Sequence, residues 1–136
     1  MKNLPLDKYP PLARKAIIFL TAAKATNEIK NRRVGSEEVS FYLLSHSVEL
    51  SIKAVAYKIT GVQPIWSHDK EELAERYRRE CSFSVDEIET VKALKNLNDG
   101  PGGLRYDNQP IGQFLPSIFD KGVKIVERLL EKFEHE

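Results

Sequence analysis

A histidine, a glutamate and a lysine recur at helical spacing in the first half of the chain, at His46, Glu49 and Lys53, with Tyr42 one turn earlier. On an α-helix, intervals of three and four residues place side chains on one face, close enough to hydrogen-bond or pair. A histidine whose acidity is tuned by such neighbours can move protons near neutral pH. The structural alternative is a satisfied polar network that fixes helix register. The sequence by itself does not choose between these two interpretations.

Apolar side chains flank this polar line on both sides of the helix that carries it, which is predicted to follow Ser36 and to reach Thr60. One stripe is expected to face the core and comprises Phe41, Leu44, Val48, Ile52, Val55 and Ile59. A further apolar stripe comprises Leu43, Leu50 and Ala54. A helix that is apolar almost all round is usually central or lies at a subunit interface, so we expect a homodimer.

Apolar residues recur at three and four along the rest of the chain as well, with hardly any period-two alternation. The pattern predicts an all-α fold, an antiparallel up-and-down bundle of about five helices, in one domain over residues 1–136. Proline, N-cap and capping-box signals set the expected boundaries. The expected helices run from about Pro10 to Arg33, Ser36 to Thr60, Asp69 to Glu80, Ser84 to Asn98, and Gln113 to Phe133.

The composition excludes several classes of protein. The chain has 136 residues and a formal net charge of +1, so its total charge favours neither nucleic acid nor anionic membranes. Cys81 is the single cysteine, which leaves no disulfide within the chain, and no Cys/His cluster offers a zinc site. The longest apolar stretch is too short to span a bilayer. We expect a cytoplasmic protein with no cofactor, no bound metal and no membrane association.

Several short motifs together resemble those of the HEPN superfamily, the "higher eukaryotes and prokaryotes nucleotide-binding" proteins. They are the run SHSVELSIKA from Ser45 to Ala54, then Gly61, His68-Asp69 at the start of a helix, and Leu104-Arg105-Tyr106. The resemblance extends over roughly Leu12 to Leu130. It implies an all-helical, usually dimeric bundle with functions in RNA cleavage, toxin–antitoxin pairs, defence or partnership with a nucleotidyltransferase.

The catalytic members of that superfamily carry an arginine followed, after four to six residues of any kind, by a histidine. The resemblance implies that the histidine moves the proton of the ribose 2′-hydroxyl while the arginine holds the phosphate. Arg105 matches the arginine here, but proline, isoleucine and glycine follow where the histidine is needed. Arg128 and His135 have a matching separation in the wrong segment, and we interpret that match as chance. The local ribonuclease motif is therefore broken.

Two functional hypotheses follow from this combination. The first is a dimeric binding or partner module for RNA or a nucleotide, without ribonuclease activity, beside a nucleotidyltransferase-type or antitoxin protein. Its groove is expected to be lined by Tyr42, His46, Glu49, Lys53, Arg105 and Tyr106. The alternative is a metal-independent ribonuclease or nucleotide-processing enzyme in which His46 and Arg105 form a nonlocal catalytic pair.

Three other segments are interpreted structurally. Asp69 is expected to be a helix N-cap with His68 as its exposed neighbour. Trp66, the only tryptophan, is expected to close the core rather than stack on a base. Arg76, Arg78 and Arg79 make the third helix basic, but neighbouring glutamates are expected to cancel most of that charge.

Overall fold

The computed structural model describes residues 4–29, 36–99 and 116–134. These residues contain helices and no strand, which confirms the prediction of an all-α fold. In chain order the elements are η1 (Leu6–Lys8), α1 (Pro11–Asn27), α2 (Ser36–Thr60), α3 (Lys70–Arg76), α4 (Val85–Asp99), α5 (Pro116–Leu130) and η3 (Glu131–Phe133).

The starts of α3 and α4 follow the signals seen in the sequence. Asp69 Oδ1 accepts hydrogen bonds from the backbone N–H groups of Glu71 and Glu72, at 3.0 and 3.2 Å. Ser84 Oγ accepts from the Glu87 N–H at 3.1 Å, and the Ser84 N–H donates to Glu87 Oε1 at 3.0 Å. These contacts satisfy backbone donors that a helix leaves unpaired at its first turn. The predicted N-cap at Asp69 and the predicted capping box of Ser84 and Glu87 are both confirmed. At α3 the capping-box spacing gives the N-cap alone, because the Asp69 N–H donates to Ser67 Oγ rather than to Glu72.

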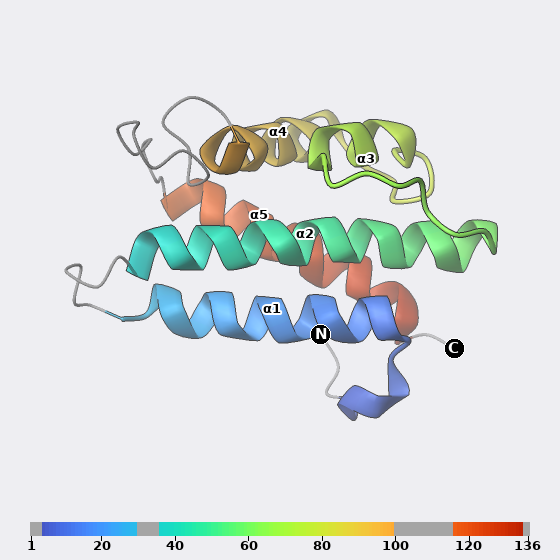
Figure 1. The fold of residues 1–136 in the computed structure, drawn as a ribbon, viewed down its shortest axis with the longest axis horizontal. Coiled ribbons are helices and arrows are strands. Elements are labelled where there is room, and N and C mark those ends of the chain that lie inside the picture. The colour runs from blue at the N-terminus through green and yellow to red at the C-terminus, as the bar shows by residue number, and fades with distance from the viewer. Residues whose placement is uncertain (1–3, 30–35, 100–115, 135–136) are drawn as a thin grey trace.

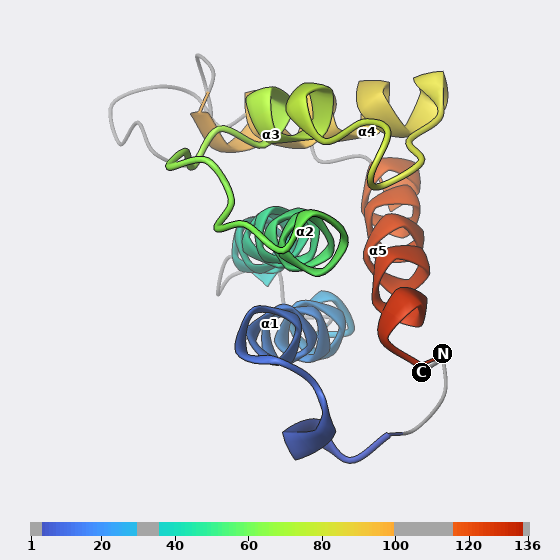
Figure 2. The same cartoon turned by 90° about the vertical axis from the view of Figure 1, so that its right-hand side faces the viewer.

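The other helices pack around α2. The antiparallel helices α1 and α2 lie side by side and make the most extensive helix–helix contact of the described chain (Figure 1). Helix α5 packs along one side of this pair, and α3 and α4 lie across α2 on the side away from α1 (Figure 2). On the side of α2 away from α5, the described part of the chain contributes the connection to α3 and no helix (Figure 2). Helix α2 is therefore central, yet one of its faces is not covered by another described helix.

A glycine lets α5 approach the centre of the bundle. A Cβ added at Gly122 would lie 2.8 Å from Leu44 Cδ2 of α2 and 3.2 Å from Leu94 Cδ1 of α4. Both leucines are fully buried. Protein interiors are packed as densely as organic crystals, so a side chain at this point would displace one of them. Gly122 therefore marks the point at which three helices meet.

Helix α3 is shorter than predicted. It ends at Arg76, whereas the periodicity of the sequence suggested an end near Glu80. Beyond it the backbone closes into turns, with the Cys81 N–H donating to the Tyr77 carbonyl at 2.9 Å and the Phe83 N–H donating to the Arg78 carbonyl at 3.0 Å. The positive φ of 54° at Ser82 completes this reversal, which regular helix does not permit.

The remaining predicted helix ends can be compared with the structure only where the structure describes the residues. Helix α1 begins at Pro11, as expected from its proline, and α2 ends at Thr60 before Gly61. Helix α1 is shorter than predicted: it ends at Asn27, because the N–H groups of Glu28 and Ile29 donate to carbonyls only three residues back, so the expected continuation of the helix to Arg33 is wrong. The expected start of the last helix at Gln113 lies outside the described residues. None of the described helices has the length and apolarity needed to cross a membrane.

The burial of the apolar stripes of α2 differs from the prediction at two places. Leu43 and Leu50 are half-buried and pack against the core of the same chain. The second apolar stripe therefore needs no partner subunit to cover it. Ile59, which was expected in the core stripe, is 54% exposed because it lies in the last turn of α2. The other five members of the core stripe are buried, as predicted.

A buried contact joins the two ends of the described chain. Tyr9 Oη donates a hydrogen bond to Glu134 Oε1 at 2.8 Å, and both residues are buried. Burial, followed by the hydrogen bond to Glu134 and its negative charge, raises the pKa of Tyr9 from 10.0 to about 12. The neutral phenol is therefore favoured in the folded state.

Replacing Tyr9 with phenylalanine is expected to lower the free energy of unfolding by about 1.5–3 kcal/mol near neutral pH, since the lost hydrogen bond involves a carboxylate. The folded-state pKa is raised, so the contribution of Tyr9 is complete below pH 10.0 and is lost as the pH rises through about 12. The gap between the two proteins should shrink by about 1.4 kcal/mol between about pH 8 and about pH 11. Urea unfolding at both pH values measures it, and a constant gap would contradict the assignment.

Candidate functional site

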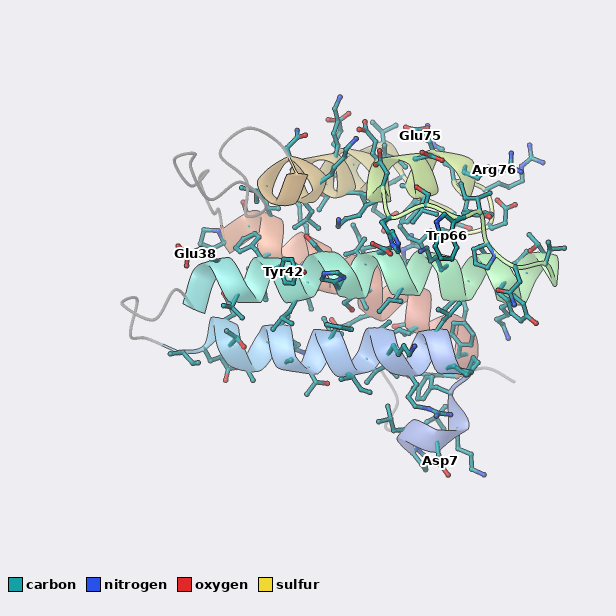
Figure 3. The ribbon with its side chains drawn as sticks, in the orientation of Figure 1. Asp7, Glu38, Tyr42, Trp66, Glu75 and Arg76 are labelled. Carbon is teal, nitrogen blue, oxygen red and sulfur yellow. The ribbon has the colours of Figure 1, made fainter. Side chains whose placement is uncertain are left out.

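The face of α2 that no other described helix covers carries most of the polar line found in the sequence. Figure 3 shows Tyr42 on this face of α2 and Trp66 on the segment that connects α2 to α3. This connection folds back over α2, and its ribbon lies on the side opposite α5 (Figure 2). Side chains of α2 and of the connection therefore meet on one accessible surface.

The carboxylate of Glu49 lies at the centre of this surface and is shared by two partners. Lys53 Nζ donates to Glu49 Oε2 at 3.1 Å, and His68 Nδ1 lies 2.9 Å from the same oxygen. An ionised carboxylate only accepts hydrogen bonds, so Nδ1 of His68 carries the proton. In the neutral imidazole, Nε2 is then an acceptor. Glu49 thus holds His68 in one orientation and one tautomer.

The three side chains differ sharply in exposure. The side chain of Glu49 is 8% exposed and that of Lys53 is 14% exposed, whereas that of His68 is 72% exposed. A buried carboxylate needs charged or hydrogen-bonding partners, and Glu49 has two of them. Exposed histidines on connections are usually mobile, but this one is tied to a buried group. The arrangement fixes an accessible imidazole on the surface of α2.

Trp66 stands next to this histidine. The two rings are arranged edge to face with centroids 6.0 Å apart. Trp66 is 95% exposed, so the prediction that it closes the core is wrong. The core beneath the connection is filled instead by Leu73 and Tyr77 from α3 and the residue after it. An indole held in solvent beside an oriented imidazole is available for stacking.

The imidazole of His46 makes ring contacts on α2 and α1. Its imidazole lies edge to face with Tyr42, with centroids 4.5 Å apart, and is stacked on Phe19 of α1 at 5.4 Å. The predicted pairing of Glu49 with Lys53 is confirmed, and the same carboxylate also contacts His68. The polar line therefore divides into an aromatic cluster and a charged cluster.

Asp69 anchors the end of the connection. Lys95 Nζ of α4 donates to Asp69 Oδ2 at 3.0 Å and to Glu71 Oε1 at 3.3 Å. Burial alone would raise the pKa of Asp69, but the hydrogen bond from Lys95 and those from the Glu72 and Glu71 backbones outweigh it and lower that pKa. The same contacts raise the pKa of Lys95, Asp69 contributing most. The residue that follows His68 is thus tied to α3 and α4.

The site predicted from the sequence is partly assembled. The structure places Tyr42, His46, Glu49 and Lys53 on one face of α2, while Arg105 and Tyr106 lie outside the described residues. Sequence reasoning did not assign a functional role to Trp66 or His68. Helical periodicity cannot show that a connection folds back onto a helix, so the only available signal was the occurrence of an aromatic residue and a histidine in a short turn-rich segment.

Arg128 and Cys81 belong to the packing of the bundle. Arg128 makes two hydrogen bonds to the carboxylate of Glu87, at 2.8 and 3.0 Å, and a third to the Cys81 carbonyl at 2.8 Å. His135 lies outside the described residues. Burial raises the pKa of the Cys81 thiol to about 12, although the nearby Arg128 opposes this shift. A thiol with such a pKa is not an activated nucleophile.

No metal site is found in the part of the chain that the structure describes, where no three His, Cys, Asp or Glu side chains are grouped to hold an ion. Comparisons with protein-family models, with curated proteins and with solved structures returned no match to this chain.

Proposed function

We propose that this chain is a HEPN-like helical module that binds a nucleotide or a short RNA strand on the face of α2 that no other described helix covers, and does not cleave it. The observation that carries the proposal is Trp66, a tryptophan left 95% exposed beside an imidazole whose orientation is fixed by a buried carboxylate. Exposing so large an apolar side chain gives a protein no stability, whereas a base can stack on it.

The neighbouring groups suit such a ligand. Nε2 of His68, as an acceptor, can receive a hydrogen bond from a ribose hydroxyl or a base N–H. Stacking of a base on an aromatic side chain contributes about 1–3 kcal/mol and tolerates any base. The net charge of +1 adds little long-range attraction, so binding must depend on these local contacts. We infer modest affinity and little sequence preference.

The homodimer and a nucleotidyltransferase-type or antitoxin protein partner belong to this proposal on the strength of the resemblance. Leu43 and Leu50 no longer argue for a second subunit, because both pack within the chain. The ribonuclease alternative needs Arg105 close to His46, and the contacts of His46 with Tyr42 and Phe19 do not by themselves favour it.

The fluorescence of Trp66 tests the proposal directly, because this residue is the only tryptophan in the chain. Titration with a short oligouridylate is expected to quench the emission to saturation, since a base in stacking contact with the indole deactivates its excited state. The strand should remain intact when recovered from the mixture. The absence of quenching by oligouridylate and by oligoadenylate would overturn the proposal. Cleavage that disappears in the His46→Ala variant would favour the ribonuclease instead.

A further inference from the structure

A hollow of about 800 Å³ lies at the end of α3, next to the connection that carries Trp66. Its walls come from the residues after α2, including Ile65, and from the turn that follows α3. Three arginines line it, Arg76, Arg78 and Arg79. This volume falls within the range of ligand-binding clefts, and guanidinium groups are the side chains best suited to phosphate oxygens.

These three arginines have no carboxylate partner within the described part of the chain, unlike several other cations on its surface. Elsewhere, Lys95, Lys121 and Arg128 each pair with a carboxylate. Among the residues that the structure describes, no carboxylate lies within ion-pairing distance of the side chains of Arg76, Arg78 or Arg79, and all three are exposed. Three guanidinium groups around one hollow repel one another unless an anion lies between them.

The glutamates expected to cancel this charge do so only in part. Glu71 is paired with Lys95, at 3.3 Å, and does not line the hollow. Glu75 and Glu80 also line the hollow, so its three arginines exceed its carboxylates by one positive charge. This small excess suits a strand that carries one charge per nucleotide better than a compact triphosphate.

One hydrogen bond holds the hollow next to the exposed indole. The Ile65 N–H donates to Tyr77 Oη at 2.9 Å, and Tyr77 is buried. Ile65 immediately precedes Trp66, and Tyr77 lies between Arg76 and Arg78 in the sequence. The bond therefore fixes the segment that bears the indole against the segment that bears the guanidinium groups. Figure 3 shows Trp66 on the connection and Arg76 at the end of α3.

We propose that this hollow is the backbone subsite for a single-stranded RNA, in which Arg78 and Arg79 contact phosphates while a base of the same strand stacks on Trp66. The inference rests on the proposed function and assigns its ligand as a strand rather than a free nucleotide. Arg76, on the last turn of α3, completes the positive rim. Because each phosphate contact releases counterions, binding must weaken with salt.

The test compares two variants of equal charge by quenching of Trp66 with oligouridylate. The Arg78→Ala/Arg79→Ala variant is expected to bind about tenfold more weakly at low salt, with the same quenching at saturation. Its slope of log affinity against log salt should be shallower by about 1.4, which corresponds to two lost contacts with a single strand. The Lys15→Ala/Lys124→Ala variant removes two exposed lysines on α1 and α5 and should match the wild type.

The outcomes separate this inference from the proposed function. If oligouridylate quenches Trp66 and the two variants bind equally, the phosphate subsite is overturned while the stacking site stands. If uridine triphosphate binds as tightly as the strand and is equally sensitive to Arg78→Ala/Arg79→Ala, the assignment of a strand is overturned. If nothing quenches Trp66 in the wild type, the proposed function itself fails. A Glu80→Gln variant that binds more tightly than the wild type supports the subsite.

Discussion

Replacing Trp66 with alanine is expected to weaken the binding of oligouridylate by about tenfold or more, with no change in the stability of the fold. Base stacking on an aromatic side chain contributes about 1–3 kcal/mol, and each 1.4 kcal/mol corresponds to about a factor of ten in affinity. Trp66 is 95% exposed, so its removal takes almost no packed surface from the folded state. The anisotropy of a fluorescein-labelled strand measures affinity without the indole.

Two further variants make this result specific. Trp66→Phe retains an aromatic face and should recover a large part of the affinity. Val85→Ala removes another exposed apolar side chain, 67% exposed at the start of α4, and should bind as the wild type does. Thermal unfolding of all three variants is expected to coincide with that of the wild type. Unchanged affinity in Trp66→Ala would remove the observation on which the proposed function rests.

The largest effect on stability is expected for Leu44→Ala, which should lower the free energy of unfolding by about 2–5 kcal/mol. Leu44 is fully buried in α2 and lies against the point where α5 comes closest, at Gly122. Deletion of the side chain removes buried apolar surface and leaves a cavity between rigid helices, which can relax only in part. Urea unfolding followed by circular dichroism measures the change.

A compensating variant tests the geometry behind this prediction. Leu44 Cδ2 is the atom nearest to a Cβ at Gly122, at 2.8 Å. In the Leu44→Ala background that atom is absent, so Gly122→Ala should recover about 1 kcal/mol through helix propensity and partial filling of the cavity. Ile18→Ala, at a side chain that is 50% exposed, serves as a control and should change stability by about 0.5 kcal/mol or less. No recovery in the double variant would contradict the contact.

Local signals in the sequence predicted the helices and the residues that cap them. Ser84 and Glu87 form the reciprocal hydrogen bonds that their spacing predicts, because a capping box is made by residues within one turn. The pairing of Glu49 with Lys53 was predictable for the same reason, since the two are one turn apart on α2. The end of α3 was not predictable, because the residues from 77 to 83 form turns although their apolar spacing is typical of a helix.

The contacts on the face of α2 that no other described helix covers could not be predicted from local spacing. His68 lies nineteen positions beyond Glu49 in the sequence, and their 2.9 Å contact exists only because the connection folds back over α2. The same fold leaves Trp66 in solvent, whereas its residue type alone indicated the core. Periodicity reports which residues share a face of one helix. It holds no information on what a later segment places against that face.

By itself the sequence determined that this protein is helical, where most helices begin, and that Tyr42, His46, Glu49 and Lys53 share one face of α2. These properties depend on hydrogen bonds and side-chain spacing within one or two turns. The tertiary structure alone decided that Glu49 pairs with His68, that Trp66 faces water, and that the arginines at the end of α3 and just beyond it line a hollow. These properties depend on how distant segments pack, since burial and pairing between them are set by the whole bundle and not by local spacing.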